Sequence, residues 1–212
     1  MRIGQFIVFG VQYDMSSDAQ IFRQVIFIRH AQYRKSPEGL TQLGRKQAKL
    51  TAQATKNLNA SKLYCSTMPR AKEMANLIAK STHLKVKARS FFCEGRLPGA
   101  IDFRKNFLEK VSRPEKEKVK KQMRAANLRA ERAFNFIFKP PRMGQSCELV
   151  VAHGNVIRFW VCKALKINSK KWRFLGISHA SITTIQIDQH GNFILLGFSD
   201  CGHIPFKMRT WN

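Results

Sequence analysis

The chain is poor in acidic residues and has no long apolar run. Of its 212 residues, 13 are Asp or Glu and 38 are Lys or Arg, which gives a formal net charge of +25 at pH 7. The longest apolar patch near the beginning, residues 6–11, is far too short to span a bilayer, and no small-residue cleavage site of the usual kind follows it. We therefore expect an intracellular protein with no transmembrane segment, cytoplasmic by default, with mitochondrial association left open.

Cysteines are few and widely spaced. They are Cys65, Cys93, Cys147, Cys162 and Cys201. An odd number without close pairs argues against a disulfide framework, and the spacing lacks the short intervals of a zinc site. We expect free thiols in a reducing compartment. An apolar fraction of 44% in 212 residues is enough for one well-packed domain and short for two.

The positive charge is large enough to attract nucleic acid, anionic membrane surfaces or acidic protein segments without specificity. No aromatic RNA-binding signature, zinc finger or helix-turn-helix pattern accompanies it. Much of the charge lies in Arg104 to Arg142, which holds thirteen Lys or Arg against four Glu and contains a long helix predicted to begin at Pro114. A solvated helix face, the commoner case, and a platform for anionic partners both explain such a segment.

A short apolar run early in the chain stops at an Arg-His pair. Residues 25–28, Val-Ile-Phe-Ile, are β-branched or aromatic and too few for a buried helix, so they predict a buried strand of a parallel sheet. Arg29 and His30 then lie at its carboxyl end, where open α/β sheets bind ligands. A guanidinium fits two phosphate oxygens, and an imidazole can act as a nucleophile or an acid-base group near neutral pH. The pair indicates a phosphate site, although many strands end in a basic residue.

A second strand and a helix place another arginine in a similar position. Residues 62–65 predict the strand, and Pro69 suits the first turn of the helix that follows. Arg70 would then project from a helix N-terminus, beside backbone N–H groups that favour anions. The alternative is a surface arginine. The position of Arg70, after a strand that could lie beside the first one, favours a role in the phosphate site.

Two further stretches carry groups of the kind that phosphate chemistry uses. Glu94 follows three apolar residues, and such surroundings hold a carboxyl proton tightly, as a general acid requires; a solvated loop glutamate is the alternative. Residues 147–152 predict another strand, which ends at His153, and Asn155 is a reasonable N-cap for a helix over 156–165. Two histidines and two arginines so far apart in sequence can converge only in a parallel α/β sheet.

The remaining elements complete this α/β prediction. Thr41 is a plausible N-cap for a helix that runs to about residue 58, and residues 84–88 predict a third strand. Residues 181–187 and 192–198 predict a hairpin that closes the sheet. Residues 1–24 show no clear period, so we interpret them as an N-terminal extension before a domain over 25–212.

Five stretches resemble, in order, the motifs of the histidine phosphatase superfamily, the phosphoglycerate mutase-like proteins. They are Arg29-His30-Ala31-Gln32-Tyr33, residues 40–48, residues 66–71, Glu94-Gly95 and His153-Gly154-Asn155. The last third of the chain is similar to a serine/threonine-protein phosphatase branch of that superfamily. The resemblance runs from about residue 25 to the end. It implies a three-layer α/β/α sandwich with a mostly parallel central sheet.

The resemblance also implies a reaction, the hydrolysis of phosphomonoesters through a phosphohistidine. The implied site consists of Arg29, His30, Arg70, Glu94, His153 and Asn155. His30 would attack the phosphorus, and Glu94 would protonate the leaving oxygen and then activate water. Both arginines and His153 would stabilise the phosphoryl oxygens, while Asn155 would help to orient the pocket. Because the arginines supply the positive charge, no metal and no cofactor are expected.

Departures from the family pattern leave alternatives open. Ala31 and Pro69 replace more usual residues, although neither supplies a reacting group. All three tryptophans lie at position 160 or later, so no tryptophan-containing assembly motif precedes the catalytic region, and only a simple homo-oligomer stays open. The alternatives to a protein phosphatase are a small-metabolite phosphatase of the same superfamily and a basic adaptor, with little catalysis, that binds acidic partners.

Overall fold

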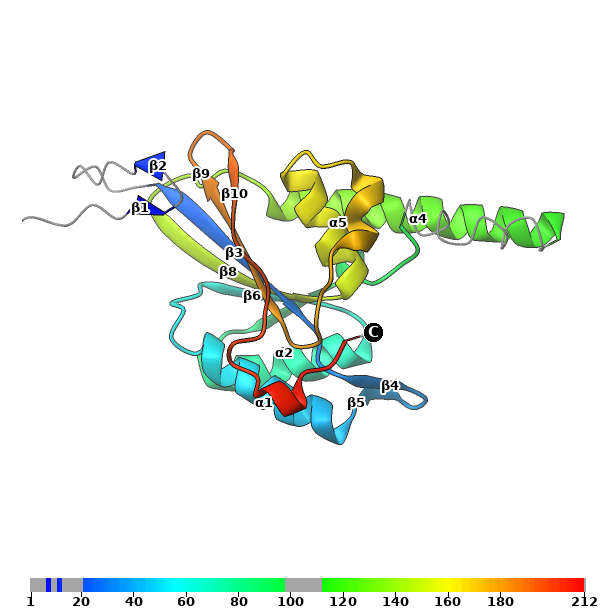
Figure 1. Cartoon of the computed structure of the whole chain (residues 1–212), viewed down its shortest axis with the longest axis horizontal. Coiled ribbons are helices and arrows are strands. Elements are labelled where there is room, and N and C mark those ends of the chain that lie inside the picture. The colour runs from blue at the N-terminus through cyan, green and yellow to red at the C-terminus, as the bar shows by residue number, and fades with distance from the viewer. Residues whose placement is uncertain (1–6, 9–10, 13–20, 98–111, 212) are drawn as a thin grey trace, which may run out of the picture.

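A six-stranded sheet forms the centre of the computed structural model, which describes residues 7–8, 11–12, 21–97 and 112–211 (Figure 1). The strand order is β10-β9-β3-β8-β6-β7. The strands are β3 (Phe22–Arg29), β6 (Lys62–Ser66), β7 (Val86–Arg89), β8 (Gln145–Ala152), β9 (Ile182–Asp188) and β10 (Phe193–Asp200). β3, β8, β6 and β7 pair in parallel, whereas β9 is antiparallel to both β3 and β10. The mostly parallel sheet confirms the predicted class.

Helices cover both faces of the sheet. α1 (Gln42–Thr55) and α2 (Pro69–Thr82) lie on one face, and α4 (Arg113–Ile137) and α5 (Gly154–Ala164) lie on the other (Figure 1). β3 serves both layers because successive side chains of a strand point to opposite faces. Its Val25 and Phe27 pack in the core that contains Trp160, and its Ile26 and Ile28 pack in the core beneath α1 and α2. The predicted three-layer sandwich is confirmed.

Short elements complete the chain around this sandwich. They are the strand pair β1 (Ile7–Val8) and β2 (Val11–Gln12), the hairpin of β4 (Tyr33–Lys35) and β5 (Glu38–Leu40), and the 3₁₀ helices η1 (Ser90–Phe92), η3 (Ser169–Phe174) and η4 (Phe206–Met208). β3 begins at Phe22, within the predicted extension. Most of residues 1–20 lie outside the described residues, so the division at residue 24 stays a prediction.

Two predicted helix starts are confirmed, one is wrong, and α4 begins one residue before the predicted Pro114. The hydroxyl of Thr41 accepts the backbone N–H of Gly44 at 2.9 Å and caps α1, and Pro69 is the first residue of α2. Asn155 is not the N-cap of α5. That position belongs to His153, and Asn155 is the second residue of the helix. The chain turns into the helix as soon as β8 ends, which leaves no room for the extra residues that the prediction assumed.

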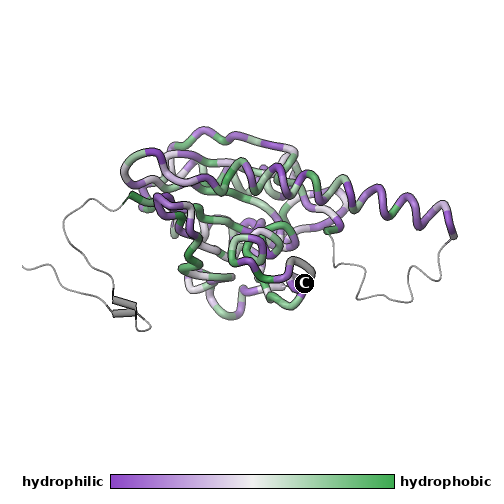
Figure 2. The backbone as a smooth tube through the Cα atoms, turned by 90° about the horizontal axis from the view of Figure 1, so that it is seen from above, coloured by the Kyte–Doolittle hydropathy of each residue, from purple (hydrophilic) through white to green (hydrophobic). Residues whose placement is uncertain are grey.

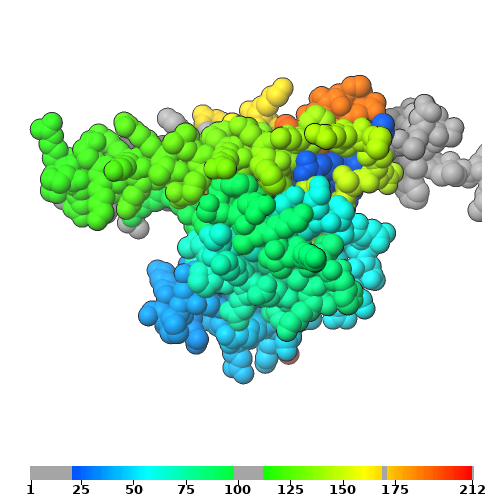
Figure 3. All heavy atoms as spheres, turned by 180° about the vertical axis from the view of Figure 1, so that it is seen from behind, coloured from blue at the N-terminus to red at the C-terminus, as the bar shows by residue number. Residues whose placement is uncertain are grey.

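α4 carries much of the basic charge and projects beyond the rest of the domain (Figures 2 and 3). Its projecting end is strongly hydrophilic (Figure 2). Small buried residues, including Ala126, Ala130 and Ala133, let its other end pack closely on the core. Residues 104–111 of the predicted basic segment lie outside the described residues. No helix in the described parts of the chain is both long and apolar enough to cross a membrane.

The first turn of α1 holds the chain that follows β3. The backbone N–H of Thr41 donates to the carbonyl oxygen of Gln32 at 3.1 Å, and the side chain of Gln47 accepts the backbone N–H of Gln32 at 2.8 Å. Gly44 permits this approach, because a Cβ atom added there would lie only 1.9 Å from the carbonyl oxygen of Gln32. The backbone two residues after His30 is therefore fixed against a helix.

We expect Gly44→Ala to lower the free energy of unfolding by about 1–3 kcal/mol, as overpacking of backbone against a side chain does. The same shift should move the segment that positions His30 and reduce activity. Urea unfolding measures the first effect. Gly197→Ala is the matched control, because a Cβ atom there meets nothing within 4 Å. Equal stability of the two variants would contradict the prediction.

Candidate active site

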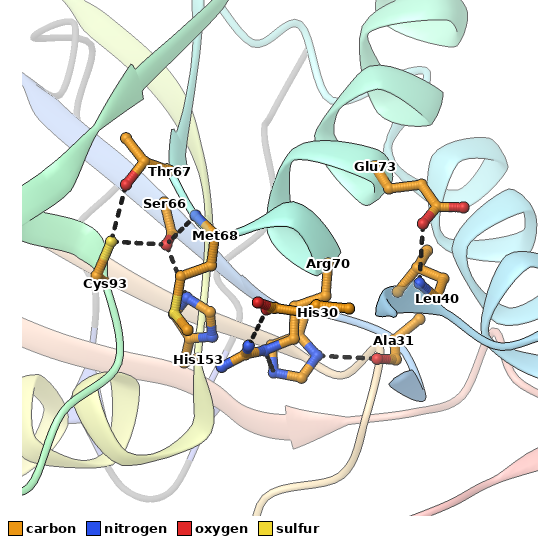
Figure 4. Close-up of polar contacts among 11 residues, drawn as sticks. His30, Ala31, Leu40, Ser66, Thr67, Met68, Arg70, Glu73, Cys93 and His153 are labelled. Atoms are coloured by element: carbon orange, nitrogen blue, oxygen red, sulfur yellow. Dashed lines mark hydrogen bonds and ion pairs between the residues drawn. The ribbon is translucent and has the colours of Figure 1, made fainter. Parts of the chain in front are cut away.

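Two imidazoles meet at the carboxyl edge of the sheet (Figure 4). His30 follows β3 and His153 follows β8, and because these strands are parallel neighbours, the two ring centres lie 5.0 Å apart. Both rings are buried. Burial lowers the pKa of each well below 6.5, and the positive charges of Arg70 and Arg29 lower it further. Both histidines are therefore neutral near pH 7.

The hydrogen bonds of His30 fix which nitrogen carries its proton. Nδ1 lies 2.8 Å from the carbonyl oxygen of Ala31, which can only accept, so Nδ1 is the protonated nitrogen. Nε2 accepts a hydrogen bond from Nε of Arg70 at 3.1 Å. Its lone pair therefore faces a guanidinium. A neutral imidazole with an unprotonated Nε2 is the form that can attack an electrophile.

Arg70 extends from the first turn of α2 and is held on several sides. Its Nη1 forms an ion pair with Glu38 of β5, and its Cζ lies 4.5 Å from the centre of the Tyr33 ring. Its Nε donates to His30. The predicted position at a helix N-terminus is confirmed, and the stacking and ion pair keep the guanidinium beside the imidazole.

Arg29 is buried at the end of β3 and is held by a returning loop. Its Nη1 donates to the carbonyl oxygen of Ile177 at 2.7 Å, and its Nη2 donates to Nε2 of His179 at 3.1 Å. Because Nε2 of His179 accepts from Arg29, the ring proton lies on Nδ1, which is 3.0 Å from the hydroxyl of Thr210. Burial lowers the pKa of Arg29 to about 10, which leaves it a cation at neutral pH.

His153 keeps one ring nitrogen without a partner. Its Nε2 lies 2.8 Å from the hydroxyl of Ser66, which accepts the backbone N–H of Met68 and also lies 3.3 Å from Sγ of Cys93. The hydroxyl donates its one proton to Sγ of Cys93, so it accepts from Nε2 of His153, and Nε2 carries the imidazole proton. Nδ1 is buried and has no hydrogen-bond partner among the described residues. The predicted contact of His153 with the phosphoryl oxygens stays a prediction.

Glu94 supplies the carboxyl group of the site. Its Oε1 accepts the backbone N–H of Gly95 at 3.1 Å, and its Oε2 accepts that of Asn155 at 3.3 Å. Burial raises the pKa of Glu94 above 4.5, although the two N–H groups and the charges of Arg70 and Arg29 work in the opposite direction. The carboxyl group thus holds its proton more tightly than a solvated glutamate does.

A cavity of about 270 Å³ joins these groups. Five of the six predicted residues line it, together with Tyr33, Gly154, Arg158 and Ile177. The sixth, His153, lies behind His30 and is fully buried. Three guanidinium groups and one carboxyl group therefore face a small space, which gives it a positive potential suited to a phosphoryl group.

Arg158 is the third of these guanidinium groups, and the sequence prediction did not assign it to the site. It lies one turn after Gly154 in α5, donates from Nε to the carbonyl oxygen of Gly154 at 3.2 Å and donates from Nη2 to the side chain of Asn155. Its Nη1 donates to the carbonyl oxygen of Leu175 at 3.1 Å. The i, i+3 spacing from Asn155 on a predicted helix was a usable signal for its position.

Ser66, Tyr33 and His179 were also not assigned roles. Ser66 ends the strand before Arg70, so its place at the sheet edge follows from the predicted strand. His179 gave no such signal. It reaches Arg29 because its loop bonds to the end of β3, where Ser181 accepts the backbone N–H of Arg29 at 3.0 Å. The local sequence around His179 does not predict its contact with Arg29, because the two residues are far apart in the chain.

The described residues include no group of three or more His, Cys, Asp or Glu side chains arranged to hold a metal ion. The cavity presents arginine nitrogens, which do not ligate metals, around its one carboxyl group. The expected independence from metals and cofactors stays a prediction.

Curated relatives match most of the chain. It is 34% identical over 202 residues to "Serine/threonine-protein phosphatase Pgam5, mitochondrial" of Drosophila willistoni, which covers 91% of the chain and 67% of that protein. It is 33% identical over 193 residues to the protein of the same name in Caenorhabditis elegans, covering 86% of the chain and 64% of the relative. The chain thus spans about two thirds of the length of these relatives.

Solved structures share the fold. A phosphoglycerate mutase from Plasmodium falciparum superposes with a TM-score of 0.60 at 27% identity, covering 88% of this chain and 96% of that one. A phosphoserine phosphatase from Entamoeba histolytica, in complex with 3-phosphoglyceric acid, superposes with a TM-score of 0.65 at 18% identity, covering 86% and 100%. The second likeness concerns the fold alone.

The family comparison covers the catalytic region. The model of the histidine phosphatase superfamily (branch 1) matches residues 25–199, a span that begins inside β3 and ends in β10. This span includes every residue that the sequence placed in the site. The fold, the matched residues and the curated relatives agree, and the chain belongs to the histidine phosphatase superfamily.

Proposed function

We propose that this histidine phosphatase removes phosphoryl groups from serine or threonine residues of proteins, through a phosphohistidine on His30. The observation that carries the proposal is the neutral His30, whose unprotonated Nε2 faces Arg70 in a cavity that also contains Glu94. The class of substrate is supported by the names of the relatives, which are serine/threonine-protein phosphatases.

In the first step, Nε2 of His30 attacks the phosphorus in line with the leaving oxygen. A phosphorus–nitrogen bond forms as the phosphorus–oxygen bond to the substrate breaks, and the leaving oxygen takes the proton of Glu94. Arg70 now donates to a phosphoryl oxygen in place of Nε2. Arg29 and the neighbouring His153, whose ring centre lies 5.0 Å from that of His30, stabilise the remaining charge.

The second step restores the enzyme. The Glu94 carboxylate takes a proton from water, whose oxygen attacks the phosphorus, and the phosphorus–nitrogen bond breaks. Its electron pair returns to Nε2 of His30, and inorganic phosphate leaves. Asn155 supports both steps because its backbone N–H holds the carboxyl group of Glu94. Ser66 accepts a hydrogen bond from Nε2 of His153 and so orients that ring, which makes Ser66 a positioning residue.

Further proposals concern the domain division, the location and the assembly of the protein. We propose an extension over residues 1–24 and a catalytic domain over 25–212, which the family match to 25–199 supports. We propose a cytoplasmic location with mitochondrial association as the alternative, since the relatives are named mitochondrial. A homo-oligomer also stays open.

The first test is hydrolysis of an aryl phosphate and of a phosphothreonine peptide in excess chelator. We expect the wild-type chain to hydrolyse both and His30→Ala to retain less than about one thousandth of the rate, because it lacks the nucleophile. The matched control is His190→Ala, at an exposed hairpin turn. Acid quench of the wild type during turnover should trap less phosphoenzyme than alkaline quench, since phosphohistidine is acid-labile.

Three outcomes would contradict parts of this proposal. Hydrolysis of the aryl phosphate without the peptide would favour the small-metabolite phosphatase. Inactivity on both substrates would favour the basic adaptor. Activity that disappears in chelator and returns with added metal would show that the arginines do not suffice for the reaction.

We expect Glu94→Gln to lower kcat/KM for an alkyl phosphate by about 100-fold or more, and for an aryl phosphate by less than about tenfold. An alkoxide needs a proton to leave, whereas a phenolate does not. For the wild type, kcat/KM with the alkyl phosphate should fall as the pH rises through the raised pKa of Glu94, because the acid is then deprotonated. Two results would exclude the role of Glu94 as the general acid. One is an equal loss of kcat/KM with both substrates, and the other is a fall of kcat/KM at high pH that is the same in the variant as in the wild type.

A second proposal concerns the basic helix. We propose that α4 binds anionic partners without specificity, since its exposed surface carries far more Lys and Arg than Glu and projects from the domain (Figure 3). The triple variant Lys118→Glu, Lys121→Glu, Arg124→Glu should elute from immobilised heparin at lower salt than a control of equal charge on α1 and its C-cap, Lys46→Glu, Lys49→Glu, Lys56→Glu. Elution of both triples at the same salt would assign the binding to net charge alone.

A further inference from the structure

A second cavity adjoins the active-site pocket. It has a volume of about 530 Å³ and lies among α5, η3, the loop after η3 and the end of β10. Arg158 and Ile177 line both cavities, so one wall separates them. Nothing in the phosphoryl chemistry described above requires this second space. Because it begins where the phosphate pocket ends, its occupant would be bound next to the phosphoryl group.

The lining of the second cavity is cationic and aromatic. Arg158 and Arg173 contribute two guanidinium groups, and Phe174 and Trp211 contribute rings that are 62% and 65% exposed. Cζ of Arg173 lies 4.9 Å from the centre of the Phe174 ring, and this stacking orients the guanidinium without neutralising it. No carboxylate lines the cavity. Its charge is complementary to an acidic ligand.

Arg158 has N–H groups beyond those that bond to its neighbours. Three of its N–H groups bond to two carbonyl oxygens and to the Asn155 side chain, and its guanidinium packs on Trp172 with Cζ 4.9 Å from the ring centre. It forms no ion pair with a carboxylate in the described part of the chain. A fixed guanidinium has five N–H donors, so two can bond to a ligand.

We propose that the second cavity binds the segment of a protein substrate that flanks the phosphorylated residue, and that it selects a segment with Asp or Glu side chains. The proposal rests on the function proposed above and names the substrates that this site prefers. The smaller pocket, at about 270 Å³, suits a phosphoryl group and the side chain that carries it. The flanking peptide has to lie outside that pocket.

The reach of a peptide fits this arrangement. An extended chain advances about 3.3–3.6 Å per residue, so a residue one to three positions from the phosphorylated one reaches the cavity beyond Arg158. A carboxylate there meets Arg158 and Arg173, and the aromatic rings cover its methylene groups. The large positive charge of the chain also attracts acidic segments to the protein as a whole.

The cavity can be tested without touching the phosphate pocket. Gly176 lines only the second cavity, and a Cβ atom added to it meets nothing within 4 Å, so Gly176→Trp fills the space while the backbone stays in place. Arg173→Glu reverses one charge of the lining. Lys46→Glu on the exposed surface of α1 is the control, because it changes the net charge by the same amount.

The experiment compares kcat/KM for two phosphothreonine peptides that differ only in flanking residues, Asp and Glu in one and Ala and Gln in the other. We expect the wild type to favour the acidic peptide about tenfold or more, as charge-assisted hydrogen bonds would give. Both cavity variants should lose this preference, while Lys46→Glu keeps it. Hydrolysis of an aryl phosphate should stay within about twofold in all variants, since such a substrate lacks a flanking segment.

Two results would overturn the inference while leaving the proposed function intact. One is equal kcat/KM of the wild type for both peptides. The other is an acidic preference that Arg173→Glu weakens no more than Lys46→Glu does, because the cavity then contributes nothing beyond net charge. If the wild type hydrolyses the aryl phosphate and neither peptide, the protein-phosphatase proposal itself fails, and this inference fails with it. If Gly176→Trp does not fold, Arg173→Glu still tests whether the second cavity selects acidic segments.

Discussion

The site depends on cations held around a neutral imidazole. Arg29, Arg70 and Arg158 face one small cavity whose single carboxyl group is Glu94, so their mutual repulsion and lost hydration have to be offset locally. Carbonyl oxygens that accept from Arg29 and Arg158, and the ion pair of Arg70 with Glu38, provide this offset. Burial and the excess positive charge together lower the pKa of both nearby histidines and keep them neutral. The same field that binds a phosphoryl group therefore prepares the nucleophile.

The fold supplies the geometry that this electrostatic arrangement needs. The parallel pairing of β3 with β8 places Arg29 opposite Ala152, and the backbone N–H of His30 donates to the carbonyl oxygen of Ala152 at 3.0 Å. A shift of one residue in this pairing would turn His30 away from the edge. Eight paired residues and two apolar cores fix the register. The register of β3 against β8 therefore sets the distance between the two imidazoles.

Sequence reasoning succeeded where a residue's position follows from its own strand or helix. Arg29, His30 and His153 lie at strand ends, and Arg70 lies in a first turn marked by Pro69, so local patterns placed them. The incorrect cap at Asn155 shows the limit of such patterns, because the residue type fitted a cap while the chain turned two residues earlier. The role of His179 could not be predicted from the sequence for another reason. Its contact with Arg29 depends on how a distant loop returns to the sheet.

The residues around the two cavities are under different constraints. The groups that contact the reacting phosphorus come from the ends of β3 and β8, the start of α2 and the segment of Glu94, where a small displacement would slow the reaction. The second cavity is formed mainly by η3, the loop after it and Trp211, which contribute no reacting group. Side chains of those segments can change while the backbone carbonyl groups of Leu175 and Ile177 still hold Arg158 and Arg29. Because loops vary more readily than strands, substrate choice in such a fold can diverge while the phosphoryl chemistry stays the same.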